Sequence, residues 1–377
     1  GYAEEMISGQ KVVKVFGHEQ KVETDFGILN QSLKDKSLKA QFYSGLMMPV
    51  MQNLNTLNYV IITIVGALLA IFRGFDVGGL AAFLQYSRQF GRPINELASL
   101  YNSIQAAIAG AERIFEIIDE APEKADVPEA VTLKNIKGDV ALKNVYFGYR
   151  PEKTILKGVS LHAPAGKKIA LVGATGAGKT TILNLLPRFF DIQSGEITID
   201  NHPIDRIERN SLRRSMAIVL QDTHLFTGTV RENIRFGRLS ATDDEVVAAA
   251  RLTAAHSFIK RLPQGYDTLL ENDGANLSQG QRQLLNIARA AVADPAILLL
   301  DEATSNIDTR SEILIQRGLD QLMQGRTSLI IAHRLSTIRN ADTILVLEHG
   351  EIIEQGSHQE LLALKGKYYS RNEEQFK

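Results

Sequence analysis

A short apolar run that ends in a glycine-rich loop constrains this chain more than any other feature. Residues 169–172 read Ile-Ala-Leu-Val, which is typical of a buried strand, and residues 173–180 read Gly-Ala-Thr-Gly-Ala-Gly-Lys-Thr. A helical pattern follows over residues 181–186. The loop matches G-x-x-x-x-G-K-[ST] in the strand–loop–helix context that makes the motif informative. The alternative is a glycine-rich turn before an ordinary helix.

The loop has the chemistry of a phosphate site. Glycines let successive backbone N–H groups curve around phosphate oxygens, and the positive end of the helix dipole lies beneath them. Lys179 is predicted to reach the β- and γ-phosphates of ATP, and the hydroxyl of Thr180 to ligate Mg²⁺. The predicted cofactor-binding residues of the loop are Gly173, Thr175, Gly176, Ala177, Gly178, Lys179, Thr180 and Thr181.

Length, charge and cysteine content exclude several classes of protein. The 377 residues have room for two or three domains. A net charge of −1 gives no basic field for nucleic acid, so we expect no nucleic-acid partner. With no cysteine, the chain has neither a disulfide framework nor a cysteine metal site. It begins with Gly1 inside a helical pattern, and we interpret it as the C-terminal part of a longer polypeptide.

The first third of the chain has the composition of a membrane segment. Residues 1–39 are polar with helical spacing, whereas the 32 residues 41–72 carry no charge and exceed the ~20 that cross a bilayer core. A polar break at residues 73–76 precedes a weaker apolar segment. We predict two transmembrane helices, at about 45–72 and 77–103, within residues 40–118, both with cytoplasmic outer ends. The alternative is a buried helical hairpin of a soluble domain.

Polar residues within these segments have two interpretations. Arg88, Arg92 and Glu96 share one helix face, so that Arg92 and Glu96 could pair. A substrate cavity would use them together with flexible methionines, which accommodate varied apolar ligands. Helix packing near the membrane surface is the preferred interpretation. The methionines concerned are Met47, Met48 and Met51.

The second half of the chain predicts a soluble α/β domain. Residues 119–130 are acidic and contain Pro122 and Pro128, as a linker does, and the domain covers residues 131–377. Helical patterns separate several strand candidates, which indicates a largely parallel sheet. Alternation over residues 140–147 predicts strands before the phosphate loop, and residues 169–172 lead into it. After the loop, the candidates lie at residues 196–200, 216–220, 296–301, 327–332 and 343–347.

Two carboxylates end one of the buried strands. Residues 297–302 read Ile-Leu-Leu-Leu-Asp-Glu. Asp301 is predicted to hold Mg²⁺ through water, and Glu302 to polarise the attacking water as a general base. The alternative is a helix N-cap, since Thr304, Ser305 and Asn306 follow.

Four further positions could contact a nucleotide. Ser278 precedes a helical run over residues 282–292, so it is either a helix cap or, with the N–H of Gly280, an anion site. Gln221 and His333 each follow a strand and could contact the γ-phosphate, the metal or water, although a lone glutamine or histidine is often a plain surface residue. Tyr149, after an early strand, could stack on a base.

Together these residues resemble the ATP-binding-cassette family, whose signature L-S-x-G-Q stands at residues 277–281. The resemblance implies an all-α transmembrane portion followed by an α/β P-loop NTPase cassette with a helical subdomain. It assigns adenine stacking to Tyr149, metal and γ-phosphate contact to Gln221, and the switch role to His333. The remaining assignments are Ser278, Gly280 and Gln281 in the signature, the carboxylates Asp301 and Glu302, and Asp308 in the D-loop.

The resemblance also implies partners and a location. The signature of one cassette completes the ATP site of another, so the partner is a second half-transporter. Helices fused ahead of a cassette indicate the exporter branch, with the last two of six spans in the cytoplasmic membrane and residues 1–39 as a cytoplasmic extension near a coupling helix. An ATP-driven exporter of a drug-like, lipid or peptide substrate follows. The alternatives are a soluble ATPase that remodels ribosomes or DNA, and a regulatory subunit that does not turn ATP over.

Two positions depart from the family pattern. Gln279 stands in the signature where glycine is commoner, and Asn272 stands where many exporters carry glutamate. Both lie on the signature side, whereas the nucleotide side is complete. The combination resembles one half of the heterodimeric bacterial exporters and favours a heterodimer, with a homodimer as the alternative.

Overall fold

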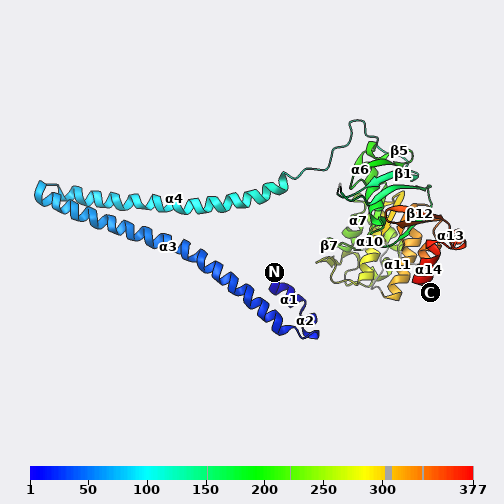
Figure 1. Cartoon of the computed structure of the whole chain (residues 1–377), viewed down its shortest axis with the longest axis horizontal. Helices are drawn as coiled ribbons and strands as arrows, with labels where there is room; N and C mark the ends of the chain where they lie inside the picture. Colours follow the sequence, from blue (N-terminus) through cyan, green and yellow to red (C-terminus); the bar gives the residue numbers. More distant parts are fainter. Residues whose placement is uncertain (151, 221, 302–307, 333–334, 377) are drawn as a thin grey trace. The chain divides into compact units, whose positions relative to one another are not determined.

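The computed structural model describes residues 1–150, 152–220, 222–301, 308–332 and 335–376. The chain forms two compact units, Gly1–Glu123 and Lys124–Lys377 (Figure 1). Within the helices, the description does not cover the side chains of residues 44, 47, 48, 91, 92, 94, 95, 97–99, 101, 102, 106, 336 and 374–376.

The division between the units falls inside the predicted linker. Lys124 forms an ion pair with Asp191 at 3.0 Å, and Asp126 accepts hydrogen bonds from the backbone and the guanidinium of Arg209 at 3.0 and 3.1 Å. These contacts attach the second half of the acidic segment to the C-terminal unit.

The N-terminal unit consists of helices α1 (Tyr2–Ser8), α2 (Gln10–Val15), α3 (Glu19–Arg73) and α4 (Val77–Ile118). The polar break between the long helices ends one and starts the other. Gly74 takes a left-handed backbone (φ +68°), which stops α3. Asp76 caps α4 by accepting a hydrogen bond from the N–H of Gly79 at 2.6 Å.

Helices α3 and α4 pack as an antiparallel hairpin beside this turn. A Cβ on Gly66 would come within 2.1 Å of the Leu80 side chain, so glycine permits the close approach. About two helical turns further from the connecting turn, the Asn58 amide of α3 donates a hydrogen bond to the Ser87 hydroxyl of α4 at 3.1 Å. In Figure 1 the two helices meet next to the turn and diverge away from it.

One helical segment in the described part of the chain, Pro49–Arg73, is long and apolar enough to cross a membrane. The second predicted span, residues 77–103, does not meet the same measure, because polar residues such as Arg88 lower its hydropathy. The side chains of Met47, Met48 and Arg92 lie outside the described residues, and so the predicted Arg92–Glu96 pair does as well.

The C-terminal unit is built on a six-stranded sheet. Its strand order is β12-β11-β3-β10-β9-β6, and all neighbours are parallel except β11 and β12. This sheet confirms the predicted α/β core. Its strands are β3 (Lys168–Gly173), β6 (Met216–Val219), β9 (Ile297–Asp301), β10 (Thr327–Ile331), β11 (Thr343–Glu348) and β12 (Glu351–Gly356).

A second sheet of four antiparallel strands has the order β2-β1-β4-β5. It contains β1 (Val140–Phe147), β2 (Leu156–Ala163), β4 (Ser194–Ile199) and β5 (His202–Pro203). The predicted strands at residues 140–147 and 196–200 are therefore present as β1 and β4, and both belong to this sheet. Residue alternation marks a strand but does not identify its partner, and β4 pairs with β1.

The remaining elements surround the sheets. They are α5 (Lys179–Leu185), η1 (Ile204–Arg206), α6 (Arg209–Arg214), β7 (Gly228–Thr229), α7 (Val230–Arg235), α8 (Asp243–Leu252), α9 (His256–Ile259), η2 (Gly265–Asp267), β8 (Leu269–Leu270), α10 (Gln279–Ala293), α11 (Thr309–Leu322), α12 (Leu335–Arg339), α13 (His358–Leu364) and α14 (Lys367–Phe376).

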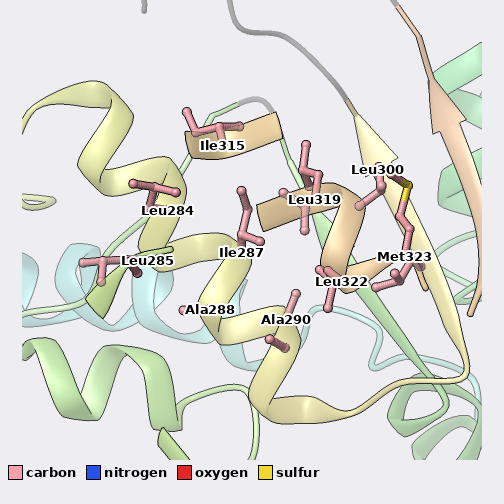
Figure 2. Close-up of a cluster of buried hydrophobic side chains, with 14 of the residues drawn as sticks. Leu284, Leu285, Ile287, Ala288, Ala290, Leu300, Ile315, Leu319, Leu322 and Met323 are labelled. Carbon is pink, nitrogen blue, oxygen red and sulfur yellow. The ribbon is translucent and has the colours of Figure 1, made fainter. Parts of the chain in front are cut away.

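The parallel sheet is buried on both faces. On β9, Leu299 packs in one hydrophobic cluster, together with the antiparallel sheet and α5, while Leu298 and Leu300 pack in the other. Figure 2 shows Leu300 in this second cluster with Ile287 of α10 and Leu319 of α11. Because both faces of the sheet are covered by apolar side chains, polar functional groups can meet a ligand only where the strands end.

Candidate functional site

Strands from separate parts of the sequence end together at one edge of the parallel sheet. Ile331 of β10 is in register with Leu171 of β3 on one side and with Asp301 of β9 on the other. The glycine-rich loop leaves β3 at this edge, and ligands of open α/β sheets bind outside the carboxyl ends of the strands. The topology therefore brings Asp301 to the loop.

The backbone of the loop requires its glycines. Gly176 and Gly178 have φ angles of +81° and +105°, which residues with a Cβ rarely adopt. A Cβ on Gly173 would lie 2.4 Å from the Leu347 carbonyl oxygen, and one on Gly178 would lie 2.7 Å from the Leu156 side chain. Helix α5 starts at Lys179, directly after these glycines, so the expected strand–loop–helix arrangement is present.

Lys179 lies over the loop. Its side chain is 7% exposed, and Nζ donates hydrogen bonds to the carbonyl oxygens of Gly173 and Ala174 at 2.8 Å each. Burial lowers the pKa of Lys179, the positive charge of Arg371 lowers it further, and Asp301 opposes both. The ammonium is held where a phosphate on the loop would meet it.

Tyr149 lies next to the same helix. Its hydroxyl donates to Oγ1 of Thr181 at 3.4 Å. Its half-exposed ring meets the rings of Phe147 and Phe190 edge-on, with centroids 5.0 and 4.9 Å away. Of the two threonines that follow Lys179, Thr180 is exposed and Thr181 is buried. The structure thus brings Tyr149 to the loop, with Thr180 open to a ligand.

Asp301 and Thr180 fit a magnesium ion chemically. Both offer hard oxygen donors, and Mg²⁺ is commonly held by one or two protein oxygens together with phosphate and water. Within the described ranges, no group of three or more histidine, cysteine or acidic side chains could form a dedicated protein cage. Two such oxygen donors would suit a metal ion that also binds the phosphates of a nucleotide.

Three predicted catalytic residues, Gln221, Glu302 and His333, lie outside the described residues. Residues on both sides of Gln221 form hydrogen bonds with Gln283 of α10. The sequence motifs did not point to Gln283 as a site residue. Its amide donates to the Leu220 carbonyl at 3.4 Å, and its Oε1 accepts from the Thr223 hydroxyl at 2.5 Å. Gln283 is only 6% exposed. The available signal was therefore a polar residue on the core-facing side of a helix, because buried polar groups need hydrogen-bond partners.

The signature residues form a helix cap. Ser278 precedes α10, its N–H donates to Oε1 of Gln281 at 2.9 Å, and its Oγ accepts from the N–H of Gln281 at 3.2 Å. Gly280 is buried in the first turn. The geometry agrees with the simple cap, and it also leaves a helix N-terminus of the kind that binds anions. In the part of the chain described, the hydrogen bonds do not join Ser278 to the phosphate loop.

The loop before the signature contacts the segment after Gln221. Asn272 and Asp273 both adopt left-handed backbone conformations, at φ +46° and +60°. The Asp273 carboxylate accepts from the N–H of Leu225 at 2.7 Å. Together with Gln283, this contact ties the signature side of the unit to the residues that flank Gln221.

Asp308 caps α11. Its carboxylate accepts hydrogen bonds from the N–H groups of Arg310 and Ser311 at 3.1 and 2.9 Å. The bond from Ser311 is the main cause that lowers the pKa of Asp308. The observed contacts are those of a helix cap.

Comparison with known protein families matches both parts of the chain. Residues 156–305 match the model of the ABC transporter family, and residues 1–94 match the model of the ABC transporter transmembrane region.

Relatives of known sequence match along almost the entire chain. The uncharacterized ABC transporter ATP-binding protein YfiC of Bacillus subtilis (strain 168) is 50% identical over 376 residues, 100% of this chain and 62% of the relative. A fatty acid ABC transporter ATP-binding/permease protein of Mycobacterium tuberculosis (strain CDC 1551 / Oshkosh) is 47% identical over 98% of this chain and 58% of its own length. An ATP-dependent lipid A-core flippase of Syntrophus aciditrophicus (strain SB) is 42% identical over 99% of this chain and 62% of its own length. The chain therefore spans about three fifths of these relatives.

A solved structure shares the fold. The structure of a bacterial Atm1-family ABC exporter with ATP bound has a TM-score of 0.84 and 38% sequence identity. The match covers 100% of this chain and 66% of that one.

Proposed function

The chain belongs to the ABC transporter family, and we propose that it is the C-terminal part of an exporter subunit that couples ATP hydrolysis to transport across the cytoplasmic membrane. The helical unit supplies the last part of the membrane domain, and the C-terminal unit is the cytoplasmic ATP-binding cassette. One observation carries the proposal: the phosphate loop, Lys179, Asp301 and Tyr149 converge at one sheet edge of a chain that also contains the apolar segment Pro49–Arg73.

The site residues of the cassette each have a proposed task in ATP binding. Tyr149 stacks on the adenine, and the N–H groups of the loop together with Lys179 hold the phosphates. Thr180 and Asp301 would hold Mg²⁺, and Gln221 would contact it. When bound, Mg²⁺ neutralises charge that develops on the transferred phosphoryl group.

Hydrolysis is proposed to depend on two further residues. Glu302 accepts a proton from the attacking water, and His333 hydrogen-bonds to the γ-phosphate or that water. Binding and catalysis are thus assigned to separate groups. A substitution of Glu302 should therefore stop turnover and leave ATP bound.

The active assembly is proposed to be a dimer of cassettes. Ser278, Gly280 and Gln281 stand at the N-terminus of α10, where backbone N–H groups can bind a phosphate held by another cassette. ATP would close the two cassettes, and hydrolysis would reopen them. The membrane helices would alternate between inward- and outward-facing states. Gln279 and Asn272 favour a heterodimer.

The substrate is proposed to be small and amphipathic or lipid-like. Two relatives carry the names fatty acid transporter and lipid A-core flippase. The described side chains of α3 and α4 include many exposed apolar ones, which suit a lipid environment and an apolar ligand. The domain division proposed from the sequence, with residues 1–39 as a cytoplasmic extension, is consistent with this assignment.

The test uses the full-length transporter, with its partner chain, in vesicles. We expect ATPase activity that responds to lipid-like ligands, and ATP-dependent movement of a fluorescent fatty acid or phospholipid. Glu302→Gln should abolish both and retain ATP binding. Detergent-free solubility of the full-length protein would favour a soluble ATPase instead, and ATP binding without turnover in the wild-type protein would favour a regulatory subunit.

A further inference from the structure

A pocket lies between the phosphate loop and the C-terminal helix α14. Its volume is about 130 Å³. Thr175 and Gly176 of the loop line one side, His349 lies at the end of β11, and Lys367 and Arg371 of α14 line the other side. No role proposed above uses α14. At this pocket α14 therefore comes next to the phosphate loop.

The first turn of α14 is fixed in place. The carboxylate of Glu354 accepts hydrogen bonds from the N–H groups of Lys367 and Tyr368 at 2.6 and 3.0 Å. Tyr368 is 2% exposed and belongs to the hydrophobic core, and its hydroxyl lies 2.6 Å from Nδ1 of His358. The Glu354 carboxylate and the buried Tyr368 thus anchor the first turn of the helix, and Arg371 lines the pocket one turn later.

Two basic residues share the face of α14 that lines the pocket, but only one of them is neutralised. Lys367 and Arg371 are four positions apart, which places them on one side of a helix. The ammonium of Lys367 pairs with Glu348 at 3.1 Å. Among the residues that the structure describes, Arg371 has no carboxylate partner. The pocket therefore contains an uncompensated guanidinium.

The charge of Arg371 reaches the phosphate loop. It is the second cause, after burial, that lowers the pKa of Lys179. Two positive groups that interact in this way repel each other, and an anion bound near both would relieve the repulsion. Thr175, whose hydroxyl can donate a hydrogen bond to an anion, lines the same pocket from the loop side.

We propose that Arg371 is a further phosphate-binding residue and that α14 completes the subsite for the polyphosphate chain of the nucleotide. This inference rests on the proposed ATP-binding function. A guanidinium is always charged and offers several donors that match phosphate oxygens. The ligand class is a nucleoside polyphosphate, and preference should increase with phosphate charge, because the pocket recognises the phosphates and not the base.

The test compares Arg371→Gln with Arg371→Lys in the full-length transporter. Dissociation constants for ATP and ADP are measured with fluorescent analogues, at low and at moderate salt. We expect Arg371→Gln to weaken ATP binding about fivefold at low salt, to weaken ADP binding less, and to lose part of this difference as salt screens the charge. Arg371→Lys should restore most of the affinity. Lys365→Gln, a matched loss of charge at an exposed position before α14, should change neither constant.

The outcomes separate this inference from its premise. Wild-type ATP affinity in Arg371→Gln would overturn the role of Arg371 and leave the ATP-binding function intact. Equal weakening of ATP and ADP in both the Gln and the Lys variant, with no dependence on salt, would show a structural effect and also overturn it. If the wild-type transporter itself did not bind ATP, the proposed function would fail first.

Discussion

The ammonium group of Lys179 donates a hydrogen bond to the carbonyl oxygen of Gly173, six residues earlier in the chain, at 2.8 Å. A second bond of the same length goes to Ala174. Both acceptors belong to the loop that Lys179 follows, so the ammonium closes the loop into a ring around the place where a phosphate would lie. A bound phosphate would replace neutral carbonyl partners with charged ones, which form stronger hydrogen bonds.

Substitution of Lys179 by methionine should therefore weaken ATP binding by about 100-fold, the scale of two charge-assisted hydrogen bonds to phosphate. Equilibrium binding of a fluorescent ATP analogue to the full-length transporter measures the effect. Lys157→Met, at an exposed position on β2, is the matched control and should bind normally. An unchanged dissociation constant in the Lys179 variant would remove the residue from the phosphate site.

Substitution of Tyr149 should separate recognition of the base from recognition of the phosphates. Tyr149→Ala should weaken ATP binding about tenfold, because stacking of a base on an aromatic ring is worth about 1–3 kcal/mol. Tyr149→Phe should stay near the wild type, since the bond to Thr181 is long at 3.4 Å. Competition by inorganic triphosphate, which has no base, should be the same in all three proteins. A tenfold change in that competition would contradict base stacking.

The structure shows why the phosphate loop could be predicted and its surroundings could not. The loop is local: its glycines, its lysine and the following helix are adjacent in sequence, and backbone sterics dictate their arrangement. The meeting of Asp301 with the loop depends on strand order, which residue alternation does not encode. For the same reason, alternation marks residues 196–200 as a strand but does not identify β1 as its partner.

Contacts between distant segments account for what the sequence analysis missed. Gln283 reads as one more polar residue of a helix, yet it is buried and bonds both to Leu220 and to Thr223. Arg371 stands in a segment without a recognisable motif, and it lines a pocket with the phosphate loop because Glu354 and the core hold α14 in place. Tertiary packing creates both arrangements, so a local pattern does not predict them.

The packing of α13 against α14 should depend on pH through His358. Burial is the main cause that lowers the pKa of His358 from 6.5, followed by the charge of Arg339. The unfolded segment therefore binds a proton more readily than the folded one, so the stability contribution is complete above pH 6.5 and is lost as pH falls towards the lowered pKa. The partner hydroxyl stays neutral throughout, since burial raises the pKa of Tyr368 to about 12.

Hydrogen exchange of the α14 amides at pH 5.5 and 7.5, corrected for the intrinsic exchange rates, measures this dependence. Protection should fall at pH 5.5 in the wild type. In His358→Gln, which keeps a polar side chain but does not titrate, protection should be lower at both values and nearly independent of pH. A pH dependence of equal size in this variant would assign the effect to another group.

The turn between α3 and α4 should face the outside of the cell. Lysines precede the first predicted span, and positive residues favour the cytoplasmic side. Gly74 is a poor place for a probe because its φ of +68° disfavours side chains. Phe75→Cys avoids this strain, and the chain contains no other cysteine in its 377 residues. An impermeant thiol reagent should label Phe75→Cys in intact cells and Lys39→Cys only after the membrane is opened. The reverse pattern would contradict the topology.

Ser278 and Glu302 should distinguish a homodimer from a heterodimer. In the proposed cassette dimer, Ser278 of one chain would face the nucleotide held by the loop of the other, whereas Glu302 would act on the nucleotide of its own chain. In a homodimer each site contains both residues, so Ser278→Ala and Glu302→Gln should each reduce hydrolysis strongly. In a heterodimer the two residues of this chain belong to opposite sites. Gln279 stands beside Ser278 in the first turn of α10, where a side chain bulkier than glycine would lie close to a phosphate.

We therefore expect unequal effects when the transporter is assembled from two different chains. Glu302→Gln should reduce turnover by about 100-fold or more, the scale of general-base catalysis. Ser278→Ala should reduce turnover only about twofold, because the serine contributes to a site with little turnover of its own. Loss of its N-cap should cost only about 1 kcal/mol of helix stability. Steady-state ATPase assays on the purified complex measure both, and Ser257→Ala, an exposed serine outside the site, is the control. Full activity from this subunit purified without another chain would rule out the heterodimer, since each of its two sites would then contain Glu302 and Ser278 together.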